Sequence, residues 1–235
     1  MRYILCIIIC FISTMIVPSN GYTAFLKGNS LYQEKKYREA LQSYNLINKK
    51  GRATWYNMGS CYFSLKKYPR AIACWRKAQK NASYKELSRI EKNITQAYEK
   101  LDHKISGPII SFTEKMVSGI SLGTLQMMFL LFWFTFFISL YWLKRKRKLV
   151  CVVLLFINCF LFLFVLSKYS VTMKQKGIVL ESVDIFVGPD THYYKLGTLQ
   201  PADEFEVLKT QKKWYKIKRA QKIGWALAAD NIEII

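Results

Sequence analysis

The sequence predicts a multidomain membrane protein that contains an α-helical repeat solenoid, a two-helix transmembrane hairpin and a small all-β barrel. Three observations carry this prediction: side chains repeated at a spacing of 31 residues, two long uncharged stretches separated by five cations, and a C-terminal series of short alternating strands. The chain has 235 residues, of which 51% are apolar, and its uncharged length gathers in three blocks. This distribution excludes a purely soluble protein and a disordered chain as expectations.

The first apolar block opens the sequence. Arg2 precedes an uncharged run over 4–17, and small residues follow at Ser19 and Gly21. Small residues at the minus-three and minus-one positions are the pattern that signal peptidase cleaves. We therefore interpret residues 1–21 as a signal peptide or an uncleaved N-terminal anchor, and the sequence leaves both open.

The second and third blocks predict transmembrane helices at 120–143 and 149–167. A helix rises about 1.5 Å per residue, so about 20 residues cross a hydrocarbon core of about 30 Å. The loop 144–148 between them consists of five cations: Lys144, Arg145, Lys146, Arg147 and Lys148. Because such cations stay on the cytoplasmic side, we expect both folded ends on the exterior face of the membrane. Linkers are predicted at 102–119 and 168–176.

The net charge of +21 is distributed unevenly. Residues 22–104 carry 18 Lys and Arg against 6 Asp and Glu, whereas residues 177–235 carry 8 of each. On an exterior face this charge favours acidic partners or anionic lipid headgroups, and a solvated cationic face explains it equally well. The predicted topology keeps the segment away from nucleic acid, so no nucleic-acid partner is expected.

Residues 22–101 are predicted to form a helical repeat domain. The first copy has Gly28, Tyr37, Ala40 and Tyr44, and the second has Gly59, Tyr68, Ala71 and Trp75, accompanied by Trp55, Tyr62 and Ala78. Small residues let the two helices of a hairpin approach, and the aromatic residues fill the groove around the contact. The pattern resembles the tetratricopeptide repeat, and residues 84–101 are predicted to be a capping helix. Such a stack either binds a segment of another protein in its groove or acts as a spacer.

Residues 177–235 are predicted to be a small barrel of five or six strands, the first of which covers 177–186. The pieces 196–199, 214–217 and 224–225 resemble the bacterial SH3 (SH3b) domain. Candidates for a groove that binds peptidoglycan peptides are Tyr193, Trp214 and Trp225. In the alternative interpretation, Trp225 packs inside the barrel and only Trp214 is exposed.

The sequence predicts no enzyme, no metal site and no cofactor. His103 and His192 lie in different segments, no residue cluster has the spacing of metal ligands, and no phosphate-binding glycine loop occurs. His192 beside Asp190 is interpreted as a surface turn. The acids Asp203, Glu204 and Glu206 are interpreted as a solvated strand edge, and Cys61 and Cys74 as buried small apolar residues rather than a disulfide.

The order of the segments resembles the aerotolerance protein BatE family. The stretch 55–62 followed by 68–72 is similar to the repeat motif of that family. The resemblance implies a multi-pass protein of the bacterial inner (cytoplasmic) membrane with both folded domains on the exterior (periplasmic) side. It further implies a non-catalytic scaffold that assembles an envelope complex with membrane-anchored von Willebrand A-domain proteins and contributes to oxidative-stress tolerance. A cell-wall-binding protein that acts through the SH3b domain is the alternative function.

Overall fold

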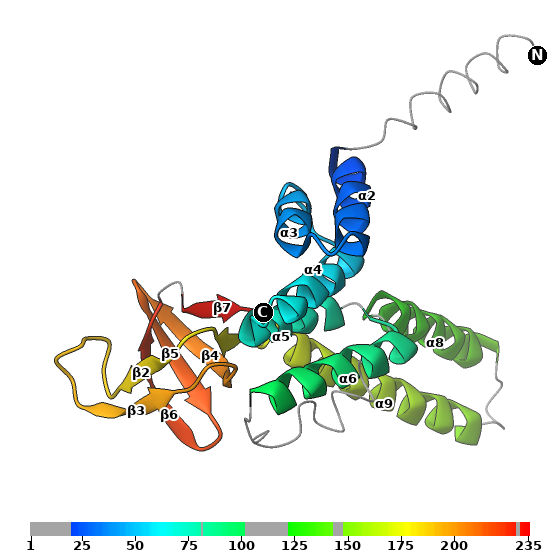
Figure 1. The fold of residues 1–235 in the computed structure, drawn as a ribbon. Helices are drawn as coiled ribbons and strands as arrows, with labels where there is room; N and C mark the ends of the chain where they lie inside the picture. Colours follow the sequence, from blue (N-terminus) through cyan, green and yellow to red (C-terminus); the bar gives the residue numbers. More distant parts are fainter. Residues whose placement is uncertain (1–19, 81, 102–121, 143–147, 229–230) are drawn as a thin grey trace, which may run out of the picture.

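The described residues between 20 and 101 fold as two helix pairs followed by a longer helix (Figure 1). The computed structural model describes residues 20–80, 82–101, 122–142, 148–228 and 231–235. The first pair is α2 (Asn20–Gln33) and α3 (Tyr37–Asn45), the second is α4 (Arg52–Ser64) and α5 (Tyr68–Gln79), and α6 (Tyr84–Lys100) follows.

The turns inside the two pairs have the same backbone geometry 31 residues apart. Lys35 and Lys66 each have a φ of 61°, the left-handed conformation that ends many helices. In both turns the next amide donates to the carbonyl oxygen five residues earlier at 2.9 Å, from Lys36 to Leu31 and from Lys67 to Tyr62. The repeat seen in the side chains therefore extends to the backbone, which identifies two copies of one helix–turn–helix unit.

The helix α6 begins with a capping box. Ser83 Oγ lies 2.6 Å from Glu86 Oε2, and the Ser83 backbone N–H donates to the same oxygen at 2.9 Å. These hydrogen bonds, the side-chain bond first, lower the pKa of Glu86. Leu87, Ile90 and Ile94 then bury one face of α6 against the apolar cluster that contains α5.

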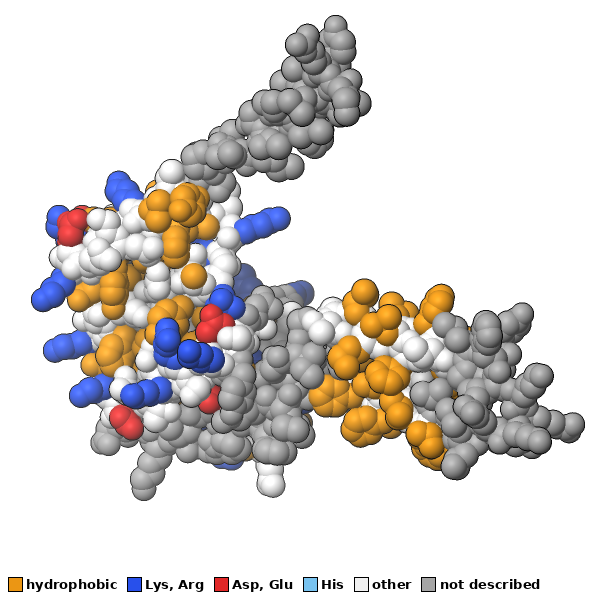
Figure 2. Space-filling view, turned by 90° about the vertical axis from the view of Figure 1, so that its right-hand side faces the viewer, with side chains coloured by type: hydrophobic (Ala, Val, Ile, Leu, Met, Phe, Trp, Pro, Cys, Tyr) orange, Lys and Arg blue, Asp and Glu red, His pale blue; other side chains and the backbone are white. Residues whose placement is uncertain are grey.

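In the sequence, a helical hairpin lies between the repeat stack and the C-terminal part. It consists of α8 (Leu122–Trp142) and α9 (Lys148–Met173). The rings of Phe129 and Phe162 lie 5.8 Å apart, and Asn158 Nδ2 donates to the carbonyl oxygen of Phe132 at 3.4 Å. Outward side chains of the hairpin are apolar and exposed, Phe134 at 73%, and they gather on one side of the molecule (Figure 2).

The structure contradicts the predicted transmembrane hairpin. Within the described residues, no helix combines the length and the apolarity that crossing a bilayer demands. The prediction rested on a count of uncharged residues over 120–143 and 149–167. A helix that crosses a bilayer must be both long enough and apolar enough, and no described helix meets both conditions. The multi-pass inner-membrane localisation with both folded ends outside depended on those spans, and it is contradicted with them.

Several predicted segments fall wholly or partly outside the described residues. Of the signal peptide or anchor at 1–21, only the last two residues are described, as the start of α2. The linker 102–119 lies outside entirely, and of the cationic loop 144–148 only Lys148 is described, as the first residue of α9. The predicted linker 168–176 is largely helical, because α9 continues to Met173.

The C-terminal part is a seven-stranded antiparallel sheet that curls around its own core (Figure 1). Its strands are β1 (Lys176–Val179), β2 (Val183–Phe186), β3 (Lys195–Leu199), β4 (Glu204–Gln211), β5 (Trp214–Arg219), β6 (Lys222–Leu227) and β7 (Ile232–Ile234). Their spatial order is β3-β2-β6-β5-β4-β1-β7. The enclosed apolar residues are Val179, Val183, Ile185, Leu199, Phe205, Ile217 and Ala226.

The stretch 177–186 forms two strands rather than the single strand predicted. β1 pairs with β4 and β7, whereas β2 pairs with β3 and β6. The bend after Val179 carries the chain from one edge region of the sheet to the other. The bend contains neither glycine nor proline, which is why the sequence analysis interpreted 177–186 as one strand.

Candidate functional site

In each helix pair, one glycine allows the two helices to approach closely. A Cβ atom on Gly59 would lie 2.5 Å from Cδ1 and Nε1 of Trp75, and one on Gly28 would overlap the ring of Tyr44. Trp75 is 2% exposed, and its Nε1 donates to the carbonyl oxygen of Tyr56 at 3.2 Å. Because glycine alone leaves room for these rings, both positions are determined by packing.

The side chain of Asn29 connects the first helix pair to the second. Its Oδ1 accepts hydrogen bonds from the Tyr44 hydroxyl at 2.7 Å and from Asn57 Nδ2 at 2.9 Å. Tyr44 belongs to α3 and Asn57 to α4, so this amide fixes the spacing between the pairs. The sequence pattern did not identify either asparagine.

The remaining residues predicted for repeat packing lie at the same contacts. Ala40, Ala71 and Ala78 are fully buried, and Tyr37, Trp55, Tyr62 and Tyr68 are half-buried at the borders of two apolar clusters. These side chains therefore pack between the helices of the repeat stack. The binding of a partner in its groove stays a prediction.

Cys61 and Cys74 are free thiols within this packing. Burial raises the pKa of Cys61 to about 12 and also raises the pKa of Cys74. Both groups therefore remain protonated at neutral pH and lack the thiolate character of reactive cysteines.

Aromatic side chains gather on the outer face of β2, β5 and β6. Trp225 is paired with Phe186 on one side and with Lys216 on the other, and paired residues point to the same face. Trp214 shares this face with Lys216, two positions along β5, and its ring meets that of Phe186 edge-on at 5.8 Å. We call these four residues the aromatic face. Trp225 thus points away from the barrel core, into which the next residue, Ala226, is buried.

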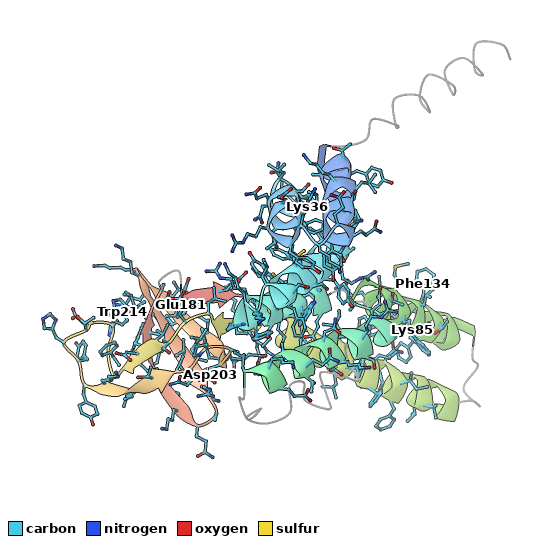
Figure 3. The ribbon with its side chains drawn as sticks, viewed as in Figure 1. Lys36, Lys85, Phe134, Glu181, Asp203 and Trp214 are labelled. Atoms are coloured by element: carbon cyan, nitrogen blue, oxygen red, sulfur yellow. The ribbon has the colours of Figure 1, made fainter. Side chains whose placement is uncertain are left out.

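Tyr193, the third residue predicted for a ligand groove, does not belong to the strands that carry the aromatic face. It stands in the connection between β2 and β3, is 53% exposed and covers Gly188, where a Cβ atom would lie 2.6 Å from its ring. Phe186, which the sequence analysis did not identify, is the ring in contact with Trp214. Trp214 lies on the side of the barrel turned away from the helical repeats (Figure 3).

The repeat stack and the barrel share one apolar core. Ile178 of β1, Ala202 before β4 and Ile235 after β7 are buried in the same cluster as Ile94 of α6 and Ile72 of α5. We call this contact the seam. Because its buried side chains come from both parts, the two predicted domains pack as one unit.

Polar side chains also meet in the seam. Glu204 Oε1 lies 2.7 Å from Arg76 Nε and 2.6 Å from Arg76 Nη2. The Tyr98 hydroxyl lies 3.0 Å from the same oxygen and 3.0 Å from the carbonyl oxygen of Ala202. Burial and, to a lesser extent, the charge of Glu204 raise the pKa of Tyr98. Since Arg76 is only 7% exposed, its charge requires Glu204 as a partner.

The prediction that Asp203, Glu204 and Glu206 form a solvated strand edge is wrong for Asp203 and Glu204. Asp203 is 2% exposed, accepts a hydrogen bond from the Gln200 backbone N–H at 2.8 Å and lies 2.5 Å from Arg219 (Figure 3). These acids lie where β4 begins, which is the part of the sheet that meets α5 and α6. Glu204 meets Arg76 in the seam, whereas Asp203 is buried with partners from the barrel itself.

A cavity of about 570 Å³ opens where the seam meets the start of α4. Its walls come from the start of α4, the end of α5, the segment before β1 and the end of β7. Five cations and one aromatic residue line it: Lys50, Arg52, Lys77, Lys80, Lys174 and Trp55. We call this space the seam cavity, and the sequence analysis did not predict it.

His192 lies in a surface turn with Asp190, as expected. Its backbone N–H donates to Asp190 Oδ1 at 3.0 Å, its Nδ1 lies 2.6 Å from that oxygen, and its side chain is 94% exposed. These bonds, the backbone bond first, lower the pKa of Asp190. Among the described residues, no three His, Cys, Asp or Glu side chains are grouped to hold a metal ion, and His103 lies outside them.

Two family models match parts of the chain. The tetratricopeptide repeat matches residues 53–83, which cover α4, α5 and the turn before α6, and the bacterial SH3 domain matches residues 181–233. No curated protein matches the chain. The helical repeat and the SH3 domain of the predicted fold are thus confirmed. Both domain types are typically non-catalytic, and together they support a role in binding proteins or peptidoglycan.

Proposed function

We propose that this protein is a non-catalytic scaffold that holds a tetratricopeptide repeat stack and an SH3 domain in one fixed orientation and binds other proteins through them. The observation that supports the proposal is the seam, in which Arg76 and Tyr98 of the repeat domain meet Glu204 of the barrel. A partner that touches both domains finds its two contacts already positioned, so it loses less entropy on binding than with flexibly linked domains.

We propose von Willebrand A-domain proteins as the partner class. The proposal is supported by the resemblance to the BatE family in domain content, a tetratricopeptide repeat followed by a bacterial SH3 domain. In that family the scaffold would assemble an envelope complex linked to oxidative-stress tolerance. The many Lys and Arg side chains that project from the repeat stack (Figure 2) favour a partner with an acidic surface.

The test is recovery of A-domain proteins with the tagged full-length chain. Ala71 is fully buried between the helices of the second pair, so Ala71→Trp separates them, and we expect partner recovery to be lost. The matched control is Gln42→Trp, which places the same side chain at an exposed position of α3 and should leave recovery unchanged. Equal recovery with Ala71→Trp would show that the repeat stack is not the binding element.

The aromatic face favours a second candidate function, the binding of peptidoglycan peptides. Full-length protein should sediment with purified peptidoglycan, and Trp214→Ala should remain in the supernatant because it removes the ring that packs against Phe186. Tyr194→Ala is the control, since Tyr194 is 78% exposed and lies outside the aromatic face. Equal sedimentation of both variants would exclude the aromatic face as the wall-binding surface.

A further inference from the structure

We infer that the seam cavity is a binding site for an acidic peptide segment of a partner protein. The inference rests on the proposed protein-binding function and names the chemistry of the ligand. The cavity has about 570 Å³, within the range of small-ligand sites, and its walls belong to both the repeat stack and the barrel. It therefore exists only while the two domains are held together.

The charge of the seam cavity selects an anion. Five of its lining residues are Lys or Arg, and no Asp or Glu side chain is among the described residues that line it. Three of these cations form ion pairs with acidic residues that do not line the cavity. The pairs are Arg52 with Glu86 at 2.8 Å, Lys77 with Glu233 at 2.5 Å and Lys174 with Glu206 at 3.3 Å. Lys50 and Lys80 have no acidic partner among the described residues, so the cavity keeps an excess of positive charge.

The start of α4 adds to this charge. Its N-cap is Gly51, in an extended conformation with φ −80° and ψ 176°, and neither a side-chain cap nor an acidic residue occupies its first turn. The N-terminus of a helix carries a partial positive charge and presents N–H donors. A Cβ atom on Gly51 would have nothing within 4 Å, so this helix end is open to a ligand.

Trp55 arranges the cations and supplies an apolar wall. Lys77 Nζ lies 4.6 Å and Lys50 Nζ 5.8 Å from its ring centroid, distances at which the ring face attracts a cation. Lys50 Nζ also donates to the carbonyl oxygen of Ile47 at 2.9 Å, which fixes the side chain. Trp55, Ile234 and Ile235 together give the cavity an apolar surface beside its charges.

This combination fits a peptide better than a phosphate chain. Four of the five cations are lysines, which act as separate point charges, whereas bidentate phosphate recognition favours arginine. The apolar wall formed by Trp55 and the two isoleucines has no use in binding a bare anion, but it accommodates an aliphatic side chain between two carboxylates. The ligand is therefore a segment that mixes Asp or Glu with Leu or Ile.

The experiment measures the fluorescence anisotropy of a labelled peptide of alternating glutamate and leucine with the full-length protein. Lys80→Glu is the informative variant. Lys80 is exposed, is the C-cap residue of α5 and has no acidic partner among the described residues, so we expect the fold to survive. Reversing this charge should weaken binding roughly tenfold, and Lys80→Met roughly threefold, with a larger effect at low ionic strength. Lys92→Glu, the same change at an exposed position of α6 outside the cavity, should alter the affinity less than about twofold.

Three results would overturn the inference. The first is equal peptide binding by Lys80→Glu and Lys92→Glu. The second is equal binding of a control peptide in which every glutamate is glutamine. The third is tighter binding of inorganic phosphate, duplex DNA or phosphatidylglycerol vesicles, with a loss in Lys80→Glu, since it would assign the cavity to phosphate groups.

Peptide binding and partner recovery, measured together, distinguish a failure of this inference from a failure of the proposed function. If A-domain proteins are recovered equally with wild type and Lys80→Glu, and the peptide does not bind, the cavity assignment fails and the scaffold stands. If the peptide binds in the cavity and no partner is recovered, the scaffold assignment fails instead.

Discussion

The hydroxyl group of Tyr98 touches two groups that are more than a hundred positions away in the sequence. It lies 3.0 Å from the carbonyl oxygen of Ala202 and 3.0 Å from Glu204 Oε1, and the side chain is 5% exposed. A buried acceptor that loses its donor costs about 1–3 kcal/mol. One phenol therefore has a measurable share in holding the barrel to the repeat stack.

We expect Tyr98→Phe to lower the free energy of unfolding by about 1–2 kcal/mol at neutral pH, since it leaves the Ala202 carbonyl without this donor. The effect should depend on pH. Burial raises the pKa of Tyr98 in the folded state, so its neutral form stabilises the fold fully below the unfolded pKa of about 10 and progressively less as the pH rises towards the folded pKa. Urea unfolding from pH 7 to strongly alkaline solution measures both effects.

The wild-type protein should therefore lose stability above pH 10 more steeply than Tyr98→Phe. Other tyrosines ionise in both proteins, so the difference between the two curves isolates Tyr98. Tyr194→Phe is the control, because that side chain is 78% exposed and its loss should leave both the stability and the slope unchanged. Parallel curves for wild type and Tyr98→Phe would contradict this account.

The helix α5 explains why the two domains form one unit. One side carries Ala71 and Trp75, which pack against α4, and another side carries Arg76 and Lys77, which pair with Glu204 and Glu233 of the barrel. A 12-residue helix has room for both contacts because neighbouring side chains point about 100° apart. The same helix is therefore an internal element of the repeat and the attachment surface of the SH3 domain.

The contacts within one helix pair could be predicted from the sequence, and the contacts between domains could not. Gly59 and Trp75 belong to one hairpin, where helical periodicity and the repeated spacing restrict which residues meet. Arg76 and Glu204 are 128 positions apart, and each looks like a solvated charge in its own segment. No local sequence pattern determines which residues of the repeat stack meet which residues of the barrel, so the seam was not predicted.

The seam cavity was missed for the same reason. Its cations were counted in the excess charge of residues 22–104, but Lys174 comes from the segment before β1 and Ile234 from the last strand. Only the docked arrangement gathers them around Trp55. The predicted spans 120–143 and 149–167 are helical over their described residues, but no described helix is both long enough and apolar enough to cross a bilayer.

The molecule as a whole should therefore unfold with its repeat stack and barrel coupled. The buried apolar cluster crosses the seam, so loss of one domain exposes apolar side chains of the other, among them Ile178 and Ile94. Coupled parts share one transition, whereas independent domains show two. The ion pair between Arg76 and Glu204 provides a means of breaking this coupling without creating a cavity.

We expect Arg76→Glu to place two carboxylates together in the seam and to cost about 3–5 kcal/mol. In hydrogen-exchange mass spectrometry across a urea series, peptides from α6 and β4 should lose protection together in wild type and at separate urea concentrations in Arg76→Glu. The double variant Arg76→Glu with Glu204→Arg restores the opposite charges and should bring the two transitions back together. Lys195→Glu opposite Asp184, a pair with side chains 50% and 42% exposed, should cost less than about 1 kcal/mol. Separate transitions already in the wild-type protein would show that the seam does not couple the domains.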